Sequence, residues 1–166
     1  MHHQLPSHPA ARRVWGALAL AVVLAACASA PEPRSAPAPT ERTPLPELAA
    51  FSARLSGRDA VPSNDSAAQG ELVAVLNRNT GLLRWKLSFS QLSGPVRGGH
   101  FHSPGMDGEV APAVLPLGRG IVSPYEGRAM LTSAQRANLL AGQWYVNLPT
   151  TRYPRGELRG QLIERR

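Results

Sequence analysis

The sequence contains a single cysteine, Cys27, among its 166 residues. One cysteine cannot pair within the chain, so no internal disulfide framework can hold the fold together. Lysine is equally scarce, because Lys86 is the only one and arginine supplies nearly all of the positive charge. The folded part must therefore rely on an apolar core, and its surface cations are mostly guanidinium groups.

Common catalytic motifs are also missing. The sequence has neither a G-x-S-x-G nucleophile motif nor a glycine-rich phosphate-binding loop. His100 and His102 are the only histidines after residue 26, and no nucleophile is paired with them in the sequence. We therefore predict that the protein is not an enzyme.

An uncharged run at residues 14–26 follows two arginines near the start of the chain. It is shorter than the roughly 20 residues of a membrane span but is typical of a signal peptide. The sequence LAAC at residues 24–27 resembles the lipobox of bacterial lipoproteins, which implies acylation of the cysteine with chains such as palmitate. We predict a lipoprotein signal peptide at residues 1–26 and lipidation at Cys27. The alternative is an ordinary secretory peptide that ends beside an incidental cysteine.

A proline- and alanine-rich stretch follows, and residues 27–46 contain almost no large apolar side chain. Such a composition cannot form a core and predicts an extended tether. More than one acyl chain gives stable membrane anchoring. The resemblance thus implies a bacterial cell-envelope protein, lipid-anchored in a membrane. The absence of Asp after Cys27 favours the outer membrane, facing the periplasm or the cell surface.

The net charge is positive. Removal of the first 26 residues leaves 16 of the 18 basic side chains against 11 acidic ones, a net of +5. Such a surplus could attract an anionic envelope polymer, phospholipid head groups or nucleic acid. The arginines are scattered, which favours an ordinary solvated surface, and nucleic acid is not expected outside the cytoplasm.

Alternating apolar and polar residues predict short β-strands in the domain at residues 47–164. The clearest alternation, at residues 82–89, places Trp85 and Phe89 in the core. Pro112 and Pro116 restrict their stretch to a sheet edge or to short pieces. Further strands are expected at residues 51–57, 70–76 and 127–131.

One helix is predicted after Thr132, because Thr132 and Gln135 match a capping box. Gly142 is placed to end the helix in a left-handed conformation. The expected apolar face consists of Ala134, Ala137, Leu140 and Ala141.

The segment Gln143–Leu162 reads as a closing β-hairpin, with alternation on both sides of a turn at Pro154 and Gly156. Many short strands and one helix predict an all-β fold, an antiparallel β-sandwich with one short helix.

The same landmarks resemble the CHRD (chordin) domain. They include Leu55-Ser56-Gly57, Gly94-Pro95-Val96 before His100-x-His102, and above all the final block, whose sequence follows the pattern YVNIHT…P.GEIRGQL almost throughout. The resemblance spans about residues 50–163. It implies an immunoglobulin-like or superoxide-dismutase-like β-sandwich and no enzymatic activity. Two positions depart from the family pattern: Ser103 replaces a glycine, and Pro149 stands where the pattern has a histidine.

His100 and His102 are the candidate metal ligands. Two residues apart on a strand, they point to one face, and paired imidazoles can hold Cu²⁺ or Zn²⁺. Asp107, Glu109 or water could complete a weak site. The alternative, which we favour, is that both rings make hydrogen bonds that fix a loop, and that no cofactor is bound.

Asn147, Glu157 and Arg159 form a second candidate cluster on the closing hairpin. They could be a recognition patch, or a structural network in which Arg159 bonds to loop carbonyls or to a carboxylate.

The leading hypothesis is a lipid-anchored, non-catalytic envelope protein with a binding or structural module that contacts an envelope protein or anionic polymer. The alternative is a weak Cu- or Zn-binding or redox-related protein that uses His100 and His102.

Overall fold

The computed structural model describes residues 47–165. The predicted signal peptide, the lipidation site Cys27 and the tether lie outside the described residues. The chain forms nine strands and one helix within that range: β1 (Leu48–Ser56), β2 (Gln69–Asn77), β3 (Leu82–Ser90), β4 (His100–His102), β5 (Ala113–Pro116), β6 (Tyr125–Met130), α1 (Ser133–Leu140), β7 (Tyr145–Leu148), β8 (Leu158–Gln161) and β9 (Ile163–Glu164). No helix of residues 47–165 is long and apolar enough to cross a membrane.

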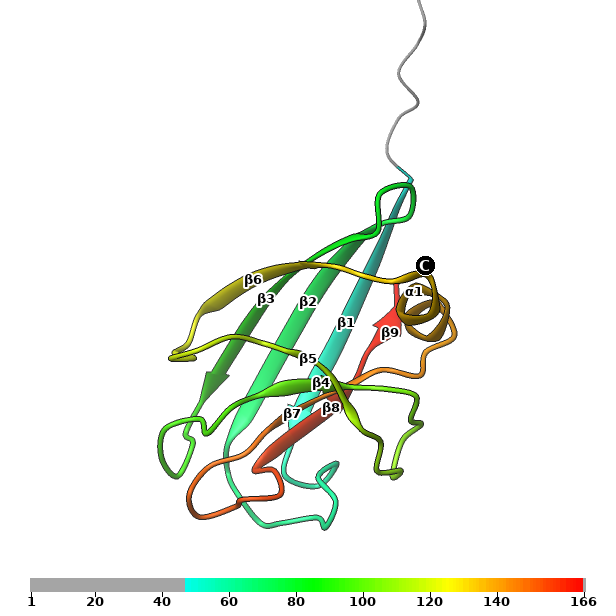
Figure 1. Ribbon diagram of the computed structural model, residues 1–166. Coiled ribbons are helices and arrows are strands. Elements are labelled where there is room, and N and C mark those ends of the chain that lie inside the picture. The colour runs from blue at the N-terminus through cyan, green and yellow to red at the C-terminus, as the bar shows by residue number, and fades with distance from the viewer. Residues whose placement is uncertain (1–46, 166) are drawn as a thin grey trace, which may run out of the picture. The chain divides into compact units, whose positions relative to one another are not determined.

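All strands belong to one antiparallel sheet with the order β5-β4-β7-β8-β1-β2-β3-β6, and β9 pairs with β1. The predicted all-β fold with one short helix is confirmed. The predicted β-sandwich is not a clear one, because all strands belong to a single curled sheet (Figure 1). Its two halves meet where Ser56 of β1 pairs with Arg159 of β8. As expected from Pro112 and Pro116, β5 is an edge strand.

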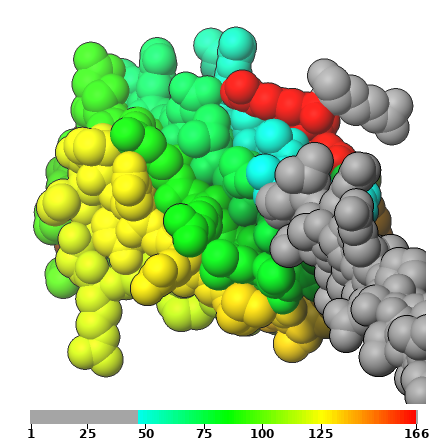
Figure 2. All heavy atoms as spheres, turned by 90° about the horizontal axis from the view of Figure 1, so that it is seen from above, coloured from blue at the N-terminus to red at the C-terminus, as the bar shows by residue number. Residues whose placement is uncertain are grey.

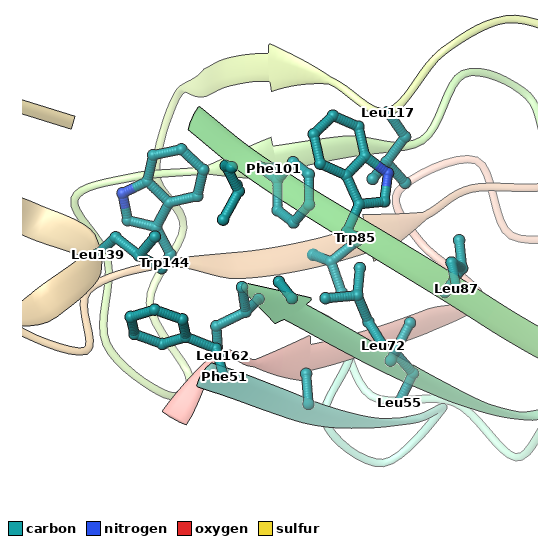
Figure 3. Packing of buried hydrophobic residues seen from close by; sticks show 14 of the residues in the cluster. Phe51, Leu55, Leu72, Trp85, Leu87, Phe101, Leu117, Leu139, Trp144 and Leu162 are labelled. Carbon is teal, nitrogen blue, oxygen red and sulfur yellow. The ribbon is translucent and has the colours of Figure 1, made fainter. Parts of the chain in front are cut away.

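The core lies between these two halves. Trp85 of β3 contacts Phe101 of β4 edge-on, with ring centroids 5.2 Å apart, and Phe101 in turn contacts Trp144 at 5.5 Å. Figure 3 shows these rings among leucines from both halves of the sheet. The predicted burial of Trp85 is confirmed, since it is 5% exposed, whereas Phe89 is only partly buried and packs against the margin of the core.

Helix α1 begins at the predicted capping box. Thr132 accepts a hydrogen bond from the Gln135 backbone amide, and the Gln135 side chain accepts one from the Thr132 amide. Gly142 follows with φ +73°, a conformation that favours glycine. The predicted apolar face is wrong, because Leu139 is the buried residue of the helix, while Ala134 and Ala137 are exposed.

The closing hairpin is formed by β7 and β8, which pair in register from Tyr145–Gln161 to Leu148–Leu158. Its inner face contributes Val146, Leu148 and Leu158 to the core. Its outer face is also covered, because Tyr145 and Arg159 are 3% and 2% exposed. The hairpin is therefore buried on both faces.

Candidate functional site

Strands β4, β7 and β8 bring five polar side chains to one outer face. His100 pairs with Asn147, His102 with Tyr145, and Asn147 with Arg159 on the other side of β7. Side chains alternate along a strand, so these residues point away from Phe101 and Val146, which face the core. The register between strands distant in sequence therefore gathers the cluster.

Tyr145 lies at the centre of this face. The His102 ring stacks on it at 4.8 Å between centroids and an interplanar angle of 3°. The guanidinium carbon of Arg159 lies 3.7 Å from the centroid of the same ring. Since β4 and β8 flank β7 on opposite sides, the phenol ring sits between an imidazole and a guanidinium group. Such cation–π contacts are favourable, more so when water is excluded.

Hydrogen bonds from these side chains fix the loop between β4 and β5. The Tyr145 hydroxyl accepts from the Ala111 amide at 2.9 Å and donates to its carbonyl at 3.3 Å. His102 donates from Nδ1 to the same carbonyl at 2.8 Å. Arg159 donates to the Met106 carbonyl at 3.0 Å. The loop is therefore held against the outer face of the hairpin.

His102 has a lowered pKa. Burial is the main cause, and the nearby charges of His100 and Arg159 act in the same direction, while the hydrogen bond to the Ala111 carbonyl opposes them. The imidazole is thus neutral near pH 7, with its proton on Nδ1 and the Nε2 lone pair free.

A cavity of about 470 Å³ opens beside the stacked rings. We call it the Tyr145 pocket. Its walls are formed by Val61, Pro62, His102, Val110, Tyr145, Asn147, Arg155 and Arg159. The wall combines two cations with apolar side chains at the rim, of which Val110 is 77% exposed.

Arg159 is the most unusual group in this wall. It is buried, and no carboxylate of residues 47–165 forms an ion pair with it. A buried charge without a counter-ion is costly, and the Tyr145 ring and one carbonyl compensate only part of that cost. The pocket therefore presents a guanidinium group suited to an anionic ligand.

The two predicted metal ligands lie close together but do not make a complete metal site. The ring centroids of His100 and His102 lie 6.2 Å apart on the same face. Within the described part of the chain, no three His, Cys, Asp or Glu side chains form a group that could hold a metal ion. Neither Asp107 nor Glu109 joins the pair, and Glu109 instead accepts a hydrogen bond from the Met106 amide at 2.8 Å.

Glu157 lies apart from Arg159, in a separate cluster. It is fully buried and accepts hydrogen bonds from Ser66 Oγ at 2.7 Å, Ser93 Oγ and N at 2.6 and 2.8 Å, and Thr150 Oγ1 at 2.6 Å. Burial by itself raises the pKa of this carboxyl, but the bonds from Ser93, Thr150 and Ser66 outweigh it, so the pKa is lowered. The carboxylate ties the loops that contain Ser66 and Ser93 to the turn of the hairpin.

The predicted cluster of three is thus divided. Asn147 and Arg159 are neighbours across β7 and β8 and line the same pocket. Asn147 donates to the Arg155 carbonyl at 2.8 Å, which positions Arg155 at the pocket wall.

A model of the CHRD domain family matches residues 51–162. The chain belongs to the CHRD domain family. No curated protein and no solved structure matches it. CHRD domains are non-enzymatic modules with a binding or structural role. Every residue of the Tyr145 pocket lies within the matched range of the CHRD domain.

Sequence reasoning missed several members of these clusters. Tyr145 and Thr150 stood in the family pattern without an assigned role, and Ser66, Ser93 and Arg155 carried no signal at all. Their partners are 91, 64 and 8 positions away in sequence. Contacts across such separations arise only when the sheet has formed.

Proposed function

We propose that this chain is a lipid-anchored, non-catalytic cell-envelope protein whose CHRD domain binds an anionic group of an envelope polymer or protein in the Tyr145 pocket. The observation that carries this proposal is the buried Arg159, which lines the pocket without a carboxylate partner among residues 47–165.

The chemistry of the wall selects the ligand class. A guanidinium group binds carboxylates and phosphates through paired N–H donors, and Arg155 adds a second positive charge. The apolar rim of Val61, Pro62 and Val110 suits a ligand whose anionic group is attached to an apolar part. Neutral sugars lack the anionic group.

The anchor is the second part of the proposal. It rests on the sequence at residues 24–27, whose cysteine is the only one in the chain. An acylated Cys27 would hold the domain at a membrane through the proline-rich tether, in the outer membrane facing the periplasm or the surface. Mass spectrometry of the N-terminal peptide from the native membrane fraction tests it: acyl chains on Cys27 are expected, and an unmodified cysteine would refute the anchor.

The binding function is tested with acetate and inorganic phosphate as probes. Titration followed by NMR of arginine side-chain Nε–H groups should shift the Arg159 signal in a saturable manner. An Arg159→Lys variant keeps the positive charge but loses the planar guanidinium group with its paired N–H donors. It should bind the probes roughly tenfold more weakly or worse. Arg119→Gln, at an exposed position outside the pocket wall, is the matched control. Equal affinity in all three proteins would refute the pocket as the binding site.

Native ligands are sought by a pull-down from the cell envelope with the same three proteins. An acidic polymer or protein that the wild type and Arg119→Gln retain, and Arg159→Lys loses, is the expected result. Retention of the same material by all three proteins would contradict the proposal.

One observation favours a second function, a weak Cu²⁺ or Zn²⁺ site at His100 and His102. The Nδ1–H of His102 donates to a carbonyl, which leaves Nε2 oriented and free, as is usual for a metal-ligating histidine. Titration with Cu²⁺ should then show tighter binding to the wild type than to a His100→Ala/His102→Ala variant. Equal Cu²⁺ binding by the two proteins would refute the hypothesis of a metal site.

A further inference from the structure

A second surface of the CHRD domain, on the opposite half of the sheet, combines exposed aliphatic and cationic side chains. It is the outer face of strands β6, β3, β2, β1 and β9, and we call it the β2 face. Figure 2 shows the surfaces of β6 (yellow), β3 (green) and β1 (cyan) along this side. Residues 47–165 expose eight large apolar side chains, and five of them lie here: Leu48, Val73, Val75, Met130 and Ile163.

Strand register places these apolar groups among cations. Val75 is flanked by Arg84 on β3 and Ala50 on β1, and Val73 by Lys86 and Ser52. The basic side chains of the face are Arg54, Arg84, Lys86, Arg128 and Arg165. Its acidic side chains are Glu71 and Glu126, so five positive charges stand against two negative ones.

Both carboxylates are already paired. Lys86 lies 3.5 Å from Glu126, and Arg165 lies 3.5 Å from Glu71. Arg84 and Arg128 instead stand directly opposite each other on β3 and β6, and neither forms an ion pair with any residue in the range 47–165. Like charges opposite each other destabilise a sheet, so this pair does not serve the fold.

We propose that the β2 face docks the domain onto an anionic phospholipid surface. Aliphatic side chains that reach the acyl boundary and basic groups that meet lipid phosphates are the two elements of interfacial binding. Arginine stems extend along the apolar surface while their guanidinium groups stay with the head groups. This inference goes beyond ligand binding in the Tyr145 pocket and involves none of its residues.

Charge argues against a second copy of the chain as the occupant. Face-to-face pairing would oppose two surfaces of the same positive sign and would bring Arg84 and Arg128 close to their own copies. An anionic bilayer has the complementary sign and tolerates scattered aliphatic groups without matched pockets.

The test labels the face directly, in the full chain with Cys27→Ser. An environment-sensitive fluorophore is attached at Ser88→Cys, an exposed position on β3, and in a matched protein at Ser63→Cys, an exposed loop position beside Pro62 of the Tyr145 pocket. Vesicles contain either phosphatidylglycerol mixed with phosphatidylcholine or phosphatidylcholine alone.

The label at position 88 should shift to shorter emission wavelength with the anionic vesicles only, and the shift should shrink as salt is raised. The label at position 63 should not respond. Equal responses at both positions, or a response to phosphatidylcholine alone, would overturn the proposal. A shift that depends on protein concentration in the absence of vesicles would do the same, since it would indicate self-association.

A charge variant gives the second readout. Arg84→Gln/Arg128→Gln should weaken the response at position 88 roughly tenfold or more, because each basic residue near an anionic surface contributes to binding. Arg97→Gln/Arg119→Gln removes two exposed arginines that lie off the β2 face and should leave it unchanged. Both variants alter exposed residues, and unchanged circular dichroism melting verifies their fold. Equal binding by the two double variants would refute the assigned face.

Discussion

The guanidinium carbon of Arg159 lies 3.7 Å from the centroid of the Tyr145 ring, on neighbouring strands of the closing hairpin. This contact explains how a buried cation is tolerated when the Tyr145 pocket is empty. The π face offers partial electrostatic compensation, and under the proposed binding function a ligand anion would supply the rest. Arg159 can therefore stabilise the hairpin and still remain available for binding.

Removal of the Tyr145 hydroxyl tests the support of the pocket. Tyr145→Phe keeps the ring stack but loses both hydrogen bonds to Ala111 and leaves a buried amide without its partner. We expect a loss of about 1–3 kcal/mol in the free energy of unfolding, measured by urea denaturation. Tyr153→Phe, which loses an exposed bond to Asp65, should change it by no more than about 0.5 kcal/mol. Equal losses would contradict the buried role of Tyr145.

The buried carboxylate of Glu157 predicts a pH dependence of stability. Its pKa is lowered in the folded state, so the unfolded chain binds a proton more readily. The contribution is fully present above the unfolded pKa of about 4.3 and is lost as pH falls through the lower folded pKa. Unfolding free energies measured between pH 7 and pH 3 should fall in that acid range.

Glu157→Gln isolates this effect. The variant should be less stable than wild type at pH 7, since an amide replaces a carboxylate that accepts four hydrogen bonds, and the difference should narrow in acid. Glu71→Gln, on an exposed face, is the control and should follow the wild-type curve. A difference between Glu157→Gln and wild type that stays constant across the range would count against the lowered pKa.

Trp85 is expected to dominate the stability of the core. Trp85→Ala removes a ring that contacts Phe101 between the two halves of the sheet. The substitution should lower the free energy of unfolding by about 3–5 kcal/mol. Phe89→Ala, at the margin of the core, should cost clearly less. Chemical denaturation of both variants checks the order, and an unchanged midpoint for Trp85→Ala would contradict the packing.

Gly160 controls the junction between the two halves of the sheet. A Cβ atom there would collide with the Arg54 carbonyl oxygen of β1, one position from the Ser56–Arg159 pair. Gly160→Ala should therefore destabilise the domain by about 1–3 kcal/mol. At Gly94 an added Cβ meets no atom within 4 Å, so Gly94→Ala should leave the melting temperature nearly unchanged. Similar melting temperatures for the two variants would show that β8 can move away from β1.

Much of the local structure could be predicted from the sequence because its causes are local. The period of two marks β1, β2 and β3, and the capping box at Thr132 marks the start of α1. Prediction failed for the buried face of α1, where the choice between Leu139 and Leu140 depends on how the helix sits against the sheet. Periodicity on a short helix could not distinguish these neighbours.

For the candidate site, the sequence by itself identified His100, His102, Asn147, Glu157 and Arg159 as residues of interest, and it determined the family pattern that contains them. Only the tertiary structure decided their environments. Alternation predicts that Glu157 and Arg159 face away from the core, but loops far away in sequence cover them. Burial changes the energetics of both charges, because it removes water from a carboxylate and a guanidinium group that the strand pattern alone would leave solvated.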